Sequence, residues 1–414
     1  MKIIYVYENW STQAPVLIGR LYVDVIKGTE SYSFEYDDNW LKNCNLLILD
    51  PMLNFYKGRQ YSSDKFLFGL FTDSAPDRWG RQLMNKMEKV NANNENRKPR
   101  KLFESDYLLG VYDESRMGAL RFSLLKNGPF LSEDDMSSIP PWTTLRTLEE
   151  ASRNIENEDF ELNNKWLNQL IRPGSSLGGA RPKATIKDQY GDLWIAKFPS
   201  KNDDMDIGLW EKVVHDLAKL CGLDVPESKI EKFSKFGSTF LVKRFDRKKG
   251  RRIHFTSAMT MLGKRDGSSA ADGVSYLDIV SFIKSYGKTP KKDLVELWKR
   301  IVFNMVVSNT DDHLRNHGFL LDNNGWILSP LFDVNPVPYG SELSLNVTEN
   351  DNTISIGLAI ETAPYYNITK EDALKISNEI INIVKNNWQQ IAKNYGLSRN
   401  QIESMKHAFS ICYQ

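Results

Sequence analysis

The sequence has few cysteines, almost no net charge and no long apolar run, and each shortage excludes a class of protein. Its 414 residues include three scattered cysteines, which rules out a disulfide framework and a zinc site built from Cys-x-x-Cys pairs. No apolar stretch approaches the roughly 18 residues of a membrane helix. The apolar start, residues 1–7, is too short for a secretory signal. We therefore predict a cytoplasmic protein with no membrane partner.

The balance of charge gives little indication of a partner. The chain has 54 basic and 53 acidic side chains, so its net charge of +1 does not require nucleic acid. Residues 241–252, LVKRFDRKKGRR, are a local exception with seven basic side chains and one aspartate. We interpret this run as a solvated hairpin end. Contact with nucleic acid or an acidic partner is the alternative.

The pattern of apolar and turn residues predicts an α+β protein with three regions. Residues 1–126 are expected to form an N-terminal domain of short strands, at 3–7, 16–25 and 32–36, with one helix. That helix is expected to start at Ser74, with Asp77 three residues later, and to end near Val90, before an exposed loop at 91–101. A helix cap alone explains the Ser74–Asp77 pattern.

The second and third regions differ in their secondary structure. Residues 127–250 are predicted to hold a linker and a β-rich unit with one helix, 207–222, whose apolar face comprises Leu209, Val213, Leu217 and Leu220. Residues 251–414 are predicted to be mainly helical. Their apolar stripe at helical spacing runs from Leu294 to Val306, and a long helix capped by Thr369 follows. One hairpin interrupts the helices, GFLL-DNNG-WILSPLF.

A loop rich in small residues and a lysine in an apolar strand suggest a phosphate site. In Ser175-Ser176-Leu177-Gly178-Gly179-Ala180-Arg181-Pro182-Lys183, backbone N–H groups can approach a phosphate closely, although a tight turn is the better explanation of the loop taken alone. Lys197 lies in the apolar strand 193–198 and needs a partner such as Glu211. The alternative is an edge lysine that extends to water.

The segment Asn309-Thr310-Asp311-Asp312-His313-Leu314-Arg315-Asn316 resembles a kinase catalytic loop in its spacing. Asp311 and Asn316 lie five residues apart, as do the base and the metal-binding asparagine of HRDxxxxN. A hairpin and then Asp333 follow, in the order in which kinases present their Mg²⁺ ligand. Two other interpretations remain: a solvated helix end, or a metal site made of Asp311, His313, His317 and Asp333.

Six segments together resemble the HipA family of bacterial toxin kinases. They are FGLFTDSAPDRWGRQLMNK, SSLGGARPKA, WIAKF, VKRFDR, NTDDHLRNHGFLL and PLFDVNP. The resemblance implies a bilobal protein-kinase-like core with a β-rich N-terminal subdomain and a mainly helical C-terminal lobe. It divides the chain into a HipA-type N-terminal domain (1–126), linker and β-rich lobe (127–250) and helical lobe (251–414).

The same resemblance implies an ATP- and Mg²⁺-dependent serine/threonine protein kinase. Asp311 is then the catalytic base, His313 belongs to the catalytic loop, and Asn316 and Asp333 bind Mg²⁺. Autophosphorylation on Ser176, or on Ser175, is expected to inactivate the enzyme. Nucleotide contacts are expected from the glycine loop, a strand lysine and a hinge: Ser176, Gly178, Gly179, Ala180, Lys183, Lys197, Val242, Lys243 and Phe245.

The biological setting also comes from the resemblance. It implies the toxin of a toxin–antitoxin pair, with a helix-turn-helix antitoxin (HipB-like) as partner and DNA bound through the complex. The expected substrate is a translation-related protein such as an aminoacyl-tRNA synthetase, with growth arrest and bacterial persistence as the consequence. Two alternatives stay open: a small-molecule or lipid kinase, and a kinase-shaped co-repressor subunit.

Overall fold

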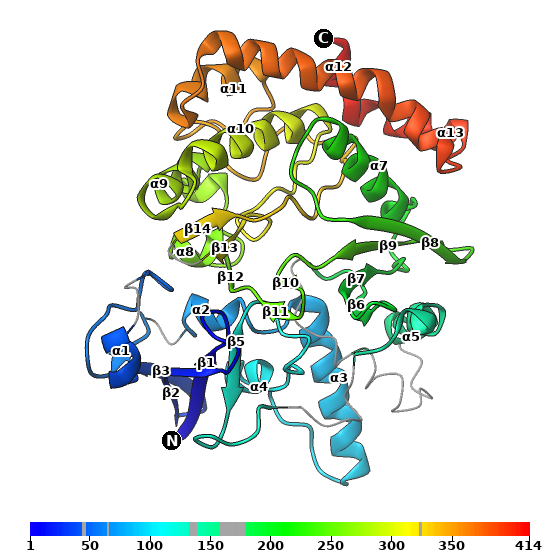
Figure 1. Cartoon of the computed structure of the whole chain (residues 1–414). Helices are drawn as coiled ribbons and strands as arrows, with labels where there is room; N and C mark the ends of the chain where they lie inside the picture. Colours follow the sequence, from blue (N-terminus) through cyan, green and yellow to red (C-terminus); the bar gives the residue numbers. More distant parts are fainter. Residues whose placement is uncertain (44–46, 64–65, 132–138, 158–169, 171–178, 323–324) are drawn as a thin grey trace. The chain divides into compact units, whose positions relative to one another are not determined.

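The computed structural model describes all residues except 44–46, 64–65, 132–138, 158–169, 171–178 and 323–324 (Figure 1). The chain forms two compact units. Unit 1 comprises Met1–Lys201 and Lys243–Thr256, and unit 2 comprises Asn202–Val242 and Ser257–Gln414. The boundaries of these two units differ from those of the three predicted domains. The domain boundaries remain a prediction.

Unit 1 begins with an antiparallel five-stranded sheet in the order β4-β3-β2-β1-β5. Its strands are β1 (Lys2–Glu8), β2 (Val16–Ile26), β3 (Thr29–Tyr36), β4 (Gln60–Tyr61) and β5 (Leu120–Ser123). The three predicted strands are confirmed. Between β2 and β3, Lys27 and Gly28 have φ values of 50° and 75°, the two positive values that a type I′ hairpin turn requires.

The helices of unit 1 correct one prediction. They are α1 (Asp38–Asn43), α2 (Gly69–Thr72), α3 (Arg78–Asn94), α4 (Glu104–Leu109) and α5 (Leu145–Glu156), with a 3-10 turn at Trp142–Thr144. The cap of α3 is Asp77, whose carboxylate accepts a hydrogen bond from Gly80 N at 2.9 Å, and Ser74 is buried before the helix begins. The helix also runs past Val90. It ends at Asn94 because Asn96, at φ 51°, closes a Schellman motif through Arg97 N and Ala92 O.

Two hairpins complete unit 1. Strands β6 (Lys183–Lys187) and β7 (Leu193–Lys197) pair antiparallel, as predicted. The short strands β10 (Arg247–Lys248) and β11 (Arg251–Arg252) form the second hairpin, and β12 (Phe255–Ser257) follows.

Unit 2 is mainly helical. It contains α7 (Ile207–Leu220), the hairpin β8 (Ser228–Ser234) and β9 (Gly237–Lys243), and the hairpin β13 (Gly318–Asp322) and β14 (Gly325–Leu328). Its other helices are α8 (Ala258–Met261), α9 (Tyr276–Tyr286), α10 (Pro290–Val306), α11 (Ile356–Thr362), α12 (Lys370–Asn394) and α13 (Arg399–Met405), with 3-10 segments at Ala270–Asp272, Ala363–Tyr366 and Lys406–Tyr413. Antiparallel sheets and separate helices confirm the α+β class.

The core of unit 2 is centred on α10. The predicted apolar stripe is confirmed, since Leu294, Trp298 and Val302 are all fully buried. The prediction for α7 is wrong at one position: Leu220, the last residue of the helix, is 52% exposed. Thr369 caps α12 by accepting a hydrogen bond from Asp372 N, as predicted. No helix in the described part of the chain is long and apolar enough to span a membrane.

Candidate active site

The loop between α10 and β13 brings two predicted site residues together. Asp311 is exposed, whereas Asn316 is buried. The Asn316 side-chain amide donates to the backbone carbonyl of Asp311 at 2.9 Å. The backbone of His313 links them further, since His313 N donates to Asp311 O and Asn316 N donates to His313 O. The loop therefore presents Asp311 to solvent on a fixed backbone.

The oxygen of the Asn316 amide has the character of a metal ligand. Asn316 Oδ1 is buried and accepts no hydrogen bond from any residue that the structure describes. A buried carbonyl oxygen left without a donor is rare and costs free energy unless a ligand satisfies it. Amide and carboxylate oxygens are the ligands that Mg²⁺ prefers, so Asn316 together with Asp333 fits this ion.

Asp333 lies after β14 in a conformation that aspartate rarely adopts. Its φ is 58°, in the left-handed region. The chain just beyond it is tied to the catalytic loop: Asn335 N donates to the Asn309 side-chain oxygen at 3.2 Å, and Val337 N donates to Ser308 O at 3.0 Å. The segment that carries Asp333 is thus fixed beside the start of the loop that carries Asp311 and Asn316.

Four buried side chains form a group around Asp312 that the sequence did not predict. We call it the Asp312 cluster: Tyr276, Asn304, Asp312 and His317. Asp312 Oδ2 accepts hydrogen bonds from Tyr276 Oη at 2.6 Å, Asn304 Nδ2 at 2.8 Å and His317 Nε2 at 2.9 Å. All four side chains are at most 1% exposed. Asp312 therefore anchors the loop to α9 and α10 from the residue next to Asp311.

The electrostatics of the Asp312 cluster favour an ionised aspartate. Burial alone raises the pKa of Asp312, but the nearby His317 and the hydrogen bonds from His317 and Tyr276 outweigh it and hold the pKa below its usual value. Burial, and then the Asp312 carboxylate, raise the pKa of Tyr276 well above its usual value. Among the described residues, no group of three or more His, Cys, Asp or Glu is arranged to hold a metal ion, and His317 faces Asp312.

The two residues of the expected lysine–glutamate pair are each buried. Lys197 is the last residue of β7 in unit 1 and is 6% exposed, and Glu211 lies on α7 in unit 2 and is 3% exposed. Because they belong to different units, their pairing remains a prediction.

The glycine loop is described only at its end. Ser175, Ser176 and Gly178 lie outside the described residues. Gly179 and Ala180 are exposed. Lys183 is buried, and its ammonium donates to the Asp77 carboxylate at 2.9 Å.

The expected hinge, Val242–Phe245, begins a strongly anchored segment. Val242 is buried at the end of β9, the Lys243 ammonium is paired with Asp192, and the ring of Phe245 lies 6.1 Å from that of Phe255. The backbone N–H of Arg244 donates to Leu193 O on β7 at 2.9 Å. This segment is thus attached to the strand that carries Lys197.

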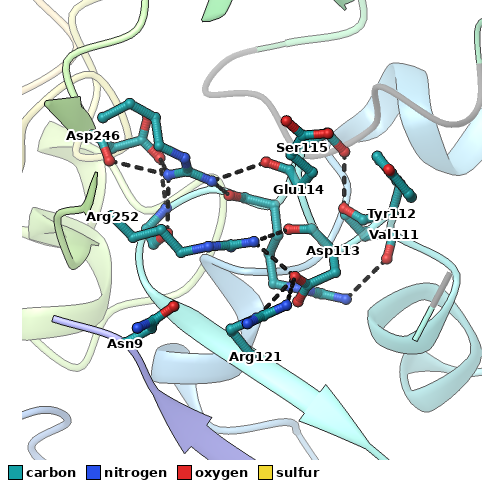
Figure 2. Close-up of polar contacts among 12 residues, drawn as sticks. Asn9, Val111, Tyr112, Asp113, Glu114, Ser115, Arg121, Asp246 and Arg252 are labelled. Carbon is teal, nitrogen blue, oxygen red and sulfur yellow. Dashed lines mark hydrogen bonds and ion pairs between the residues drawn. The ribbon is translucent and has the colours of Figure 1, made fainter. Parts of the chain in front are cut away.

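The basic run is solvated only at its tip, which corrects the prediction. Lys248, Lys249 and Arg251 are exposed, whereas the other arginines of the run join a cluster in unit 1. We call it the arginine cluster: Asp113, Arg116, Arg121, Arg244, Asp246, Arg247 and Arg252. Figure 2 shows Arg121 and Arg252 both directed at the Asp113 carboxylate, each at 2.7 Å.

Asp246 is the second carboxylate of the arginine cluster. It is fully buried and accepts from Arg244, Arg247 and the backbone N–H of Gly118. Burial raises the pKa of Asp246, but the two guanidinium groups outweigh this and lower it to about 2. Burial lowers the pKa of Arg247 to about 9. The guanidinium groups also bind backbone oxygens, among them Ser115 O and Glu114 O, which ties residues 113–118 to the hinge segment.

A match to a family model shows to which family of known proteins this chain belongs. The model described as the HipA-like C-terminal domain matches residues 175–404, which is more than half of the 414 residues. The chain belongs to this family. The matched region contains Lys197, Asp311, Asn316 and Asp333, and the resemblance to HipA predicted from the sequence is confirmed.

Two curated proteins with kinase names match part of this HipA-like chain. A Haemophilus influenzae protein named "Putative kinase" is 30% identical over 187 residues, which are 40% of this chain and 54% of that protein. A Sinorhizobium fredii protein named "Putative kinase Y4mE" is 31% identical over 148 residues, 34% of this chain and 33% of its own length. The chain thus spans about half the length, or less, of the curated relatives it matches.

A solved structure shows that the HipA fold extends over the whole chain. HipA of Shewanella oneidensis MR-1, solved with HipB and its operator DNA, matches with a TM-score of 0.67 over 99% of this chain and 96% of that one. At 17% sequence identity this likeness establishes the fold alone. The predicted kinase-like HipA fold is confirmed.

Proposed function

We propose that this HipA-like chain is an ATP- and Mg²⁺-dependent serine/threonine protein kinase. The observation that carries the proposal is the Asn316 amide, which donates to Asp311 O and has a buried oxygen with no donor in the described part of the chain. A solvated helix end does not need such an oxygen. A phosphotransfer site does, because a cation must be held close to the residue that accepts the substrate proton.

Each residue of the proposed site has a distinct role. Asp311 orients the hydroxyl of the substrate and accepts its proton, and its exposed position supports this role. Asn316 and Asp333 are the proposed Mg²⁺ ligands, and Mg²⁺ when bound neutralises charge on the phosphates of ATP. His313 holds the loop between Asp311 and Asn316 through its backbone.

The nucleotide is proposed to bind along three segments. Lys197 and the glycine loop with Ser176, Gly178, Gly179 and Ala180 serve the phosphates. Val242, Lys243 and Phe245 serve the adenine. The anchoring of this hinge by Arg244 supports a preformed adenine site, since a fixed segment loses little entropy on binding.

Autophosphorylation on Ser176, with Ser175 as second candidate, is proposed to switch the enzyme off. A phosphate adds about −2 charge to the loop that must hold ATP phosphates, so repulsion displaces the nucleotide. A Ser176→Asp variant should lose most of its activity. Full activity in that variant would contradict the switch.

The proposed biological role is that of a toxin in a toxin–antitoxin pair. The fold is that of the Shewanella oneidensis HipA, which was solved with HipB and operator DNA. We propose a HipB-like helix-turn-helix partner for this chain, and a translation-related protein such as an aminoacyl-tRNA synthetase as the substrate whose phosphorylation arrests growth.

A co-repressor role on DNA is a second candidate, supported by the exposed hairpin tip. Lys248, Lys249 and Arg251 form a small basic surface there. If the tip contacts phosphates, Arg251→Ala should reduce the salt dependence of operator binding by the complex with its antitoxin. A small-molecule or lipid kinase is tested by offering lipid and sugar acceptors beside protein.

The deciding experiment is mass spectrometry of the intact protein and its peptides after incubation with ATP and Mg²⁺. The protein as purified is measured first, and Asp311→Asn is the matched control. We expect phosphate on Ser176 or Ser175 in the wild type and none in the control. No phosphate transfer to any acceptor, together with no ATP binding by calorimetry, would contradict the proposed function.

A further inference from the structure

A buried ion pair joins the start of α3 to the start of β6. Lys183 Nζ donates to Asp77 Oδ2 at 2.9 Å, and the two side chains are 4% and 3% exposed. A charge removed from water needs a close partner, so this pair fixes both residues tightly. Asp77 comes from the N-terminal region, outside the segment matched by the family model.

The same pair holds the end of the glycine loop. Lys183 Nζ also donates to Gly179 O at 3.1 Å, and the indole N–H of Trp79 donates to Lys183 O at 3.1 Å. Lys183 is therefore bound at its side chain and at its backbone by the first residues of α3. Gly179, four residues earlier, is bound through the same ammonium.

The pair also bears on the strand that carries Lys197. In the register of β6 and β7, Lys183 lies directly opposite Lys197. Two like charges at opposing positions destabilise a strand pair. Asp77 reduces this conflict because its carboxylate neutralises the charge of Lys183.

We propose that Asp77 is a positioning residue of the nucleotide site. It holds Lys183, and through Lys183 it sets the place of Gly179 and the register of the strand that ends in Lys197. This inference rests on the proposed kinase function for its consequence, but not for the contact itself. Lys183 then acts on the phosphate site through the chain and not as a ligand of ATP.

The opposite role for Lys183 predicts an effect of opposite sign. If its ammonium bound a phosphate of ATP, Asp77 would compete for that ammonium. Removing the Asp77 charge would then strengthen nucleotide binding. If Asp77 positions the loop, removing its charge weakens binding.

The chain offers a clean set of variants. Asp77→Asn removes the charge but retains an acceptor for Gly80 N, since asparagine caps helices as well as aspartate does. Lys183→Met removes the ammonium and keeps an unbranched apolar side chain, and the double variant removes both charges. Lys57→Met is the control, because Lys57 pairs with Asp38 on the surface of the same unit.

Two measurements are needed on each full-length variant. The first is the dissociation constant of a non-hydrolysable ATP analogue with Mg²⁺, by calorimetry. The second is hydrogen–deuterium exchange of residues 179–187 without nucleotide, with the β1–β3 sheet as the reference for intact folding. If Asp77→Asn fails to fold, Trp79→Phe takes its place: it removes the indole donor to Lys183 O and keeps a buried aromatic ring, although a smaller one.

We expect Asp77→Asn and Lys183→Met each to weaken binding roughly tenfold, to raise exchange at residues 179–187, and to be non-additive in the double variant. Lys57→Met should match the wild type. Unchanged or tighter binding by Asp77→Asn, with unchanged exchange, would overturn the inference. Raised exchange in a protein that binds no nucleotide at all would instead overturn the proposed function and leave the contact established.

Discussion

The arginine cluster of unit 1 and the Asp312 cluster of unit 2 bury charge in two different ways. The arginine cluster places five guanidinium groups around two carboxylates, and backbone oxygens accept several further N–H groups. The Asp312 cluster surrounds one carboxylate with a phenol, an amide and an imidazole. The first joins residues 113–121 to residues 244–252, more than 120 positions away, and the second fixes one loop.

The difference shows which residues each cluster serves. Arginine ion pairs can join segments that lie far apart in sequence, because each guanidinium group has several donors and binds a carboxylate and backbone carbonyls at the same time. In the Asp312 cluster, three donors from a phenol, an amide and an imidazole converge on one carboxylate oxygen and set one side chain precisely. This arrangement suits a residue adjacent to the proposed catalytic base.

Removing a carboxylate from the arginine cluster should have the largest effect. Asp246→Ala leaves Arg244 and Arg247 buried without their shared partner, and we expect the free energy of unfolding to fall by about 3–5 kcal/mol. Urea denaturation measures it. Asp322→Ala, at an exposed pair with Lys288, is the control and should cost at most about 1 kcal/mol. Equal losses in the two variants would show that the cluster is not a buried ion-pair network.

The Asp312 cluster should respond in both stability and activity. We expect Asp312→Asn to lower the free energy of unfolding by about 1.5–3 kcal/mol, since hydrogen bonds to a charged acceptor are lost. Phosphate transfer should fall with it because the loop shifts. Asp311→Asn is the matched neighbour: it should abolish transfer and leave stability within about 0.5 kcal/mol, as its side chain is exposed. Full phosphate transfer by Asp312→Asn would show that the Asp312 cluster does not position the proposed active site.

A histidine beside the arginine cluster should make unit 1 sensitive to pH. His254 is buried, its ring stacks on Trp10 at 4.6 Å, and burial lowers its pKa from 6.5 to about 3. Its neutral form is favoured in the fold, so stability is complete above pH 6.5. Below that, the unfolded chain takes up a proton, and stability falls by up to about 1.4 kcal/mol per pH unit.

Urea titrations between pH 7 and pH 5 test this dependence. His254→Phe retains the ring contact and should remove the loss of stability on acidification, leaving the opposite dependence of Asp50, whose pKa is raised by burial to about 6. Asp246 does not contribute in this range, because its pKa of about 2 limits its loss of stability to the interval between about pH 4 and pH 2. A loss of stability on acidification that persists in His254→Phe would assign the effect to another group.

The smallest effect is expected at the tip of the basic run. Arg251→Ala should change the free energy of unfolding by less than about 0.5 kcal/mol, because the side chain is exposed. Arg252→Ala, one residue away, should cost more since Arg252 binds the Asp113 carboxylate and Asp113 O. Thermal unfolding of the two variants compares them directly, and similar losses would mean that Arg252 is not part of the cluster.

The sequence predicted features that depend on local spacing. The interval from Asp311 to Asn316, the apolar stripe of α10 and the strands around Lys197 all follow from short-range patterns. The choice between Asp311 and Asp312 as the exposed carboxylate does not, because neighbouring residues of a loop have no fixed periodicity. The contacts of Arg244 with Arg116 O and of Arg252 with Asp113 were also beyond local reasoning, since they join residues more than 120 positions apart.

The predicted helix start at Ser74 and the predicted burial of Leu220 on α7 were wrong for a related reason. Several polar residues near a proline can cap a helix, and the one that does is decided by tertiary contacts. Here Asp77 also binds Lys183, which favours it over Ser74. At the end of α7, Leu220 fits the apolar spacing but is 52% exposed, whereas Leu217 in the same turn is fully buried.

The chain enters unit 1, leaves it at Lys201 and returns for Lys243–Thr256. This discontinuity has a consequence for synthesis on the ribosome. When residue 201 emerges, Asp113 still lacks Arg252, and the carbonyls of Ser115 and Arg116 still lack Arg244. The first-made region must therefore wait until Asn202–Val242 of the other unit has been made, and no single cut of the gene separates two self-sufficient fragments.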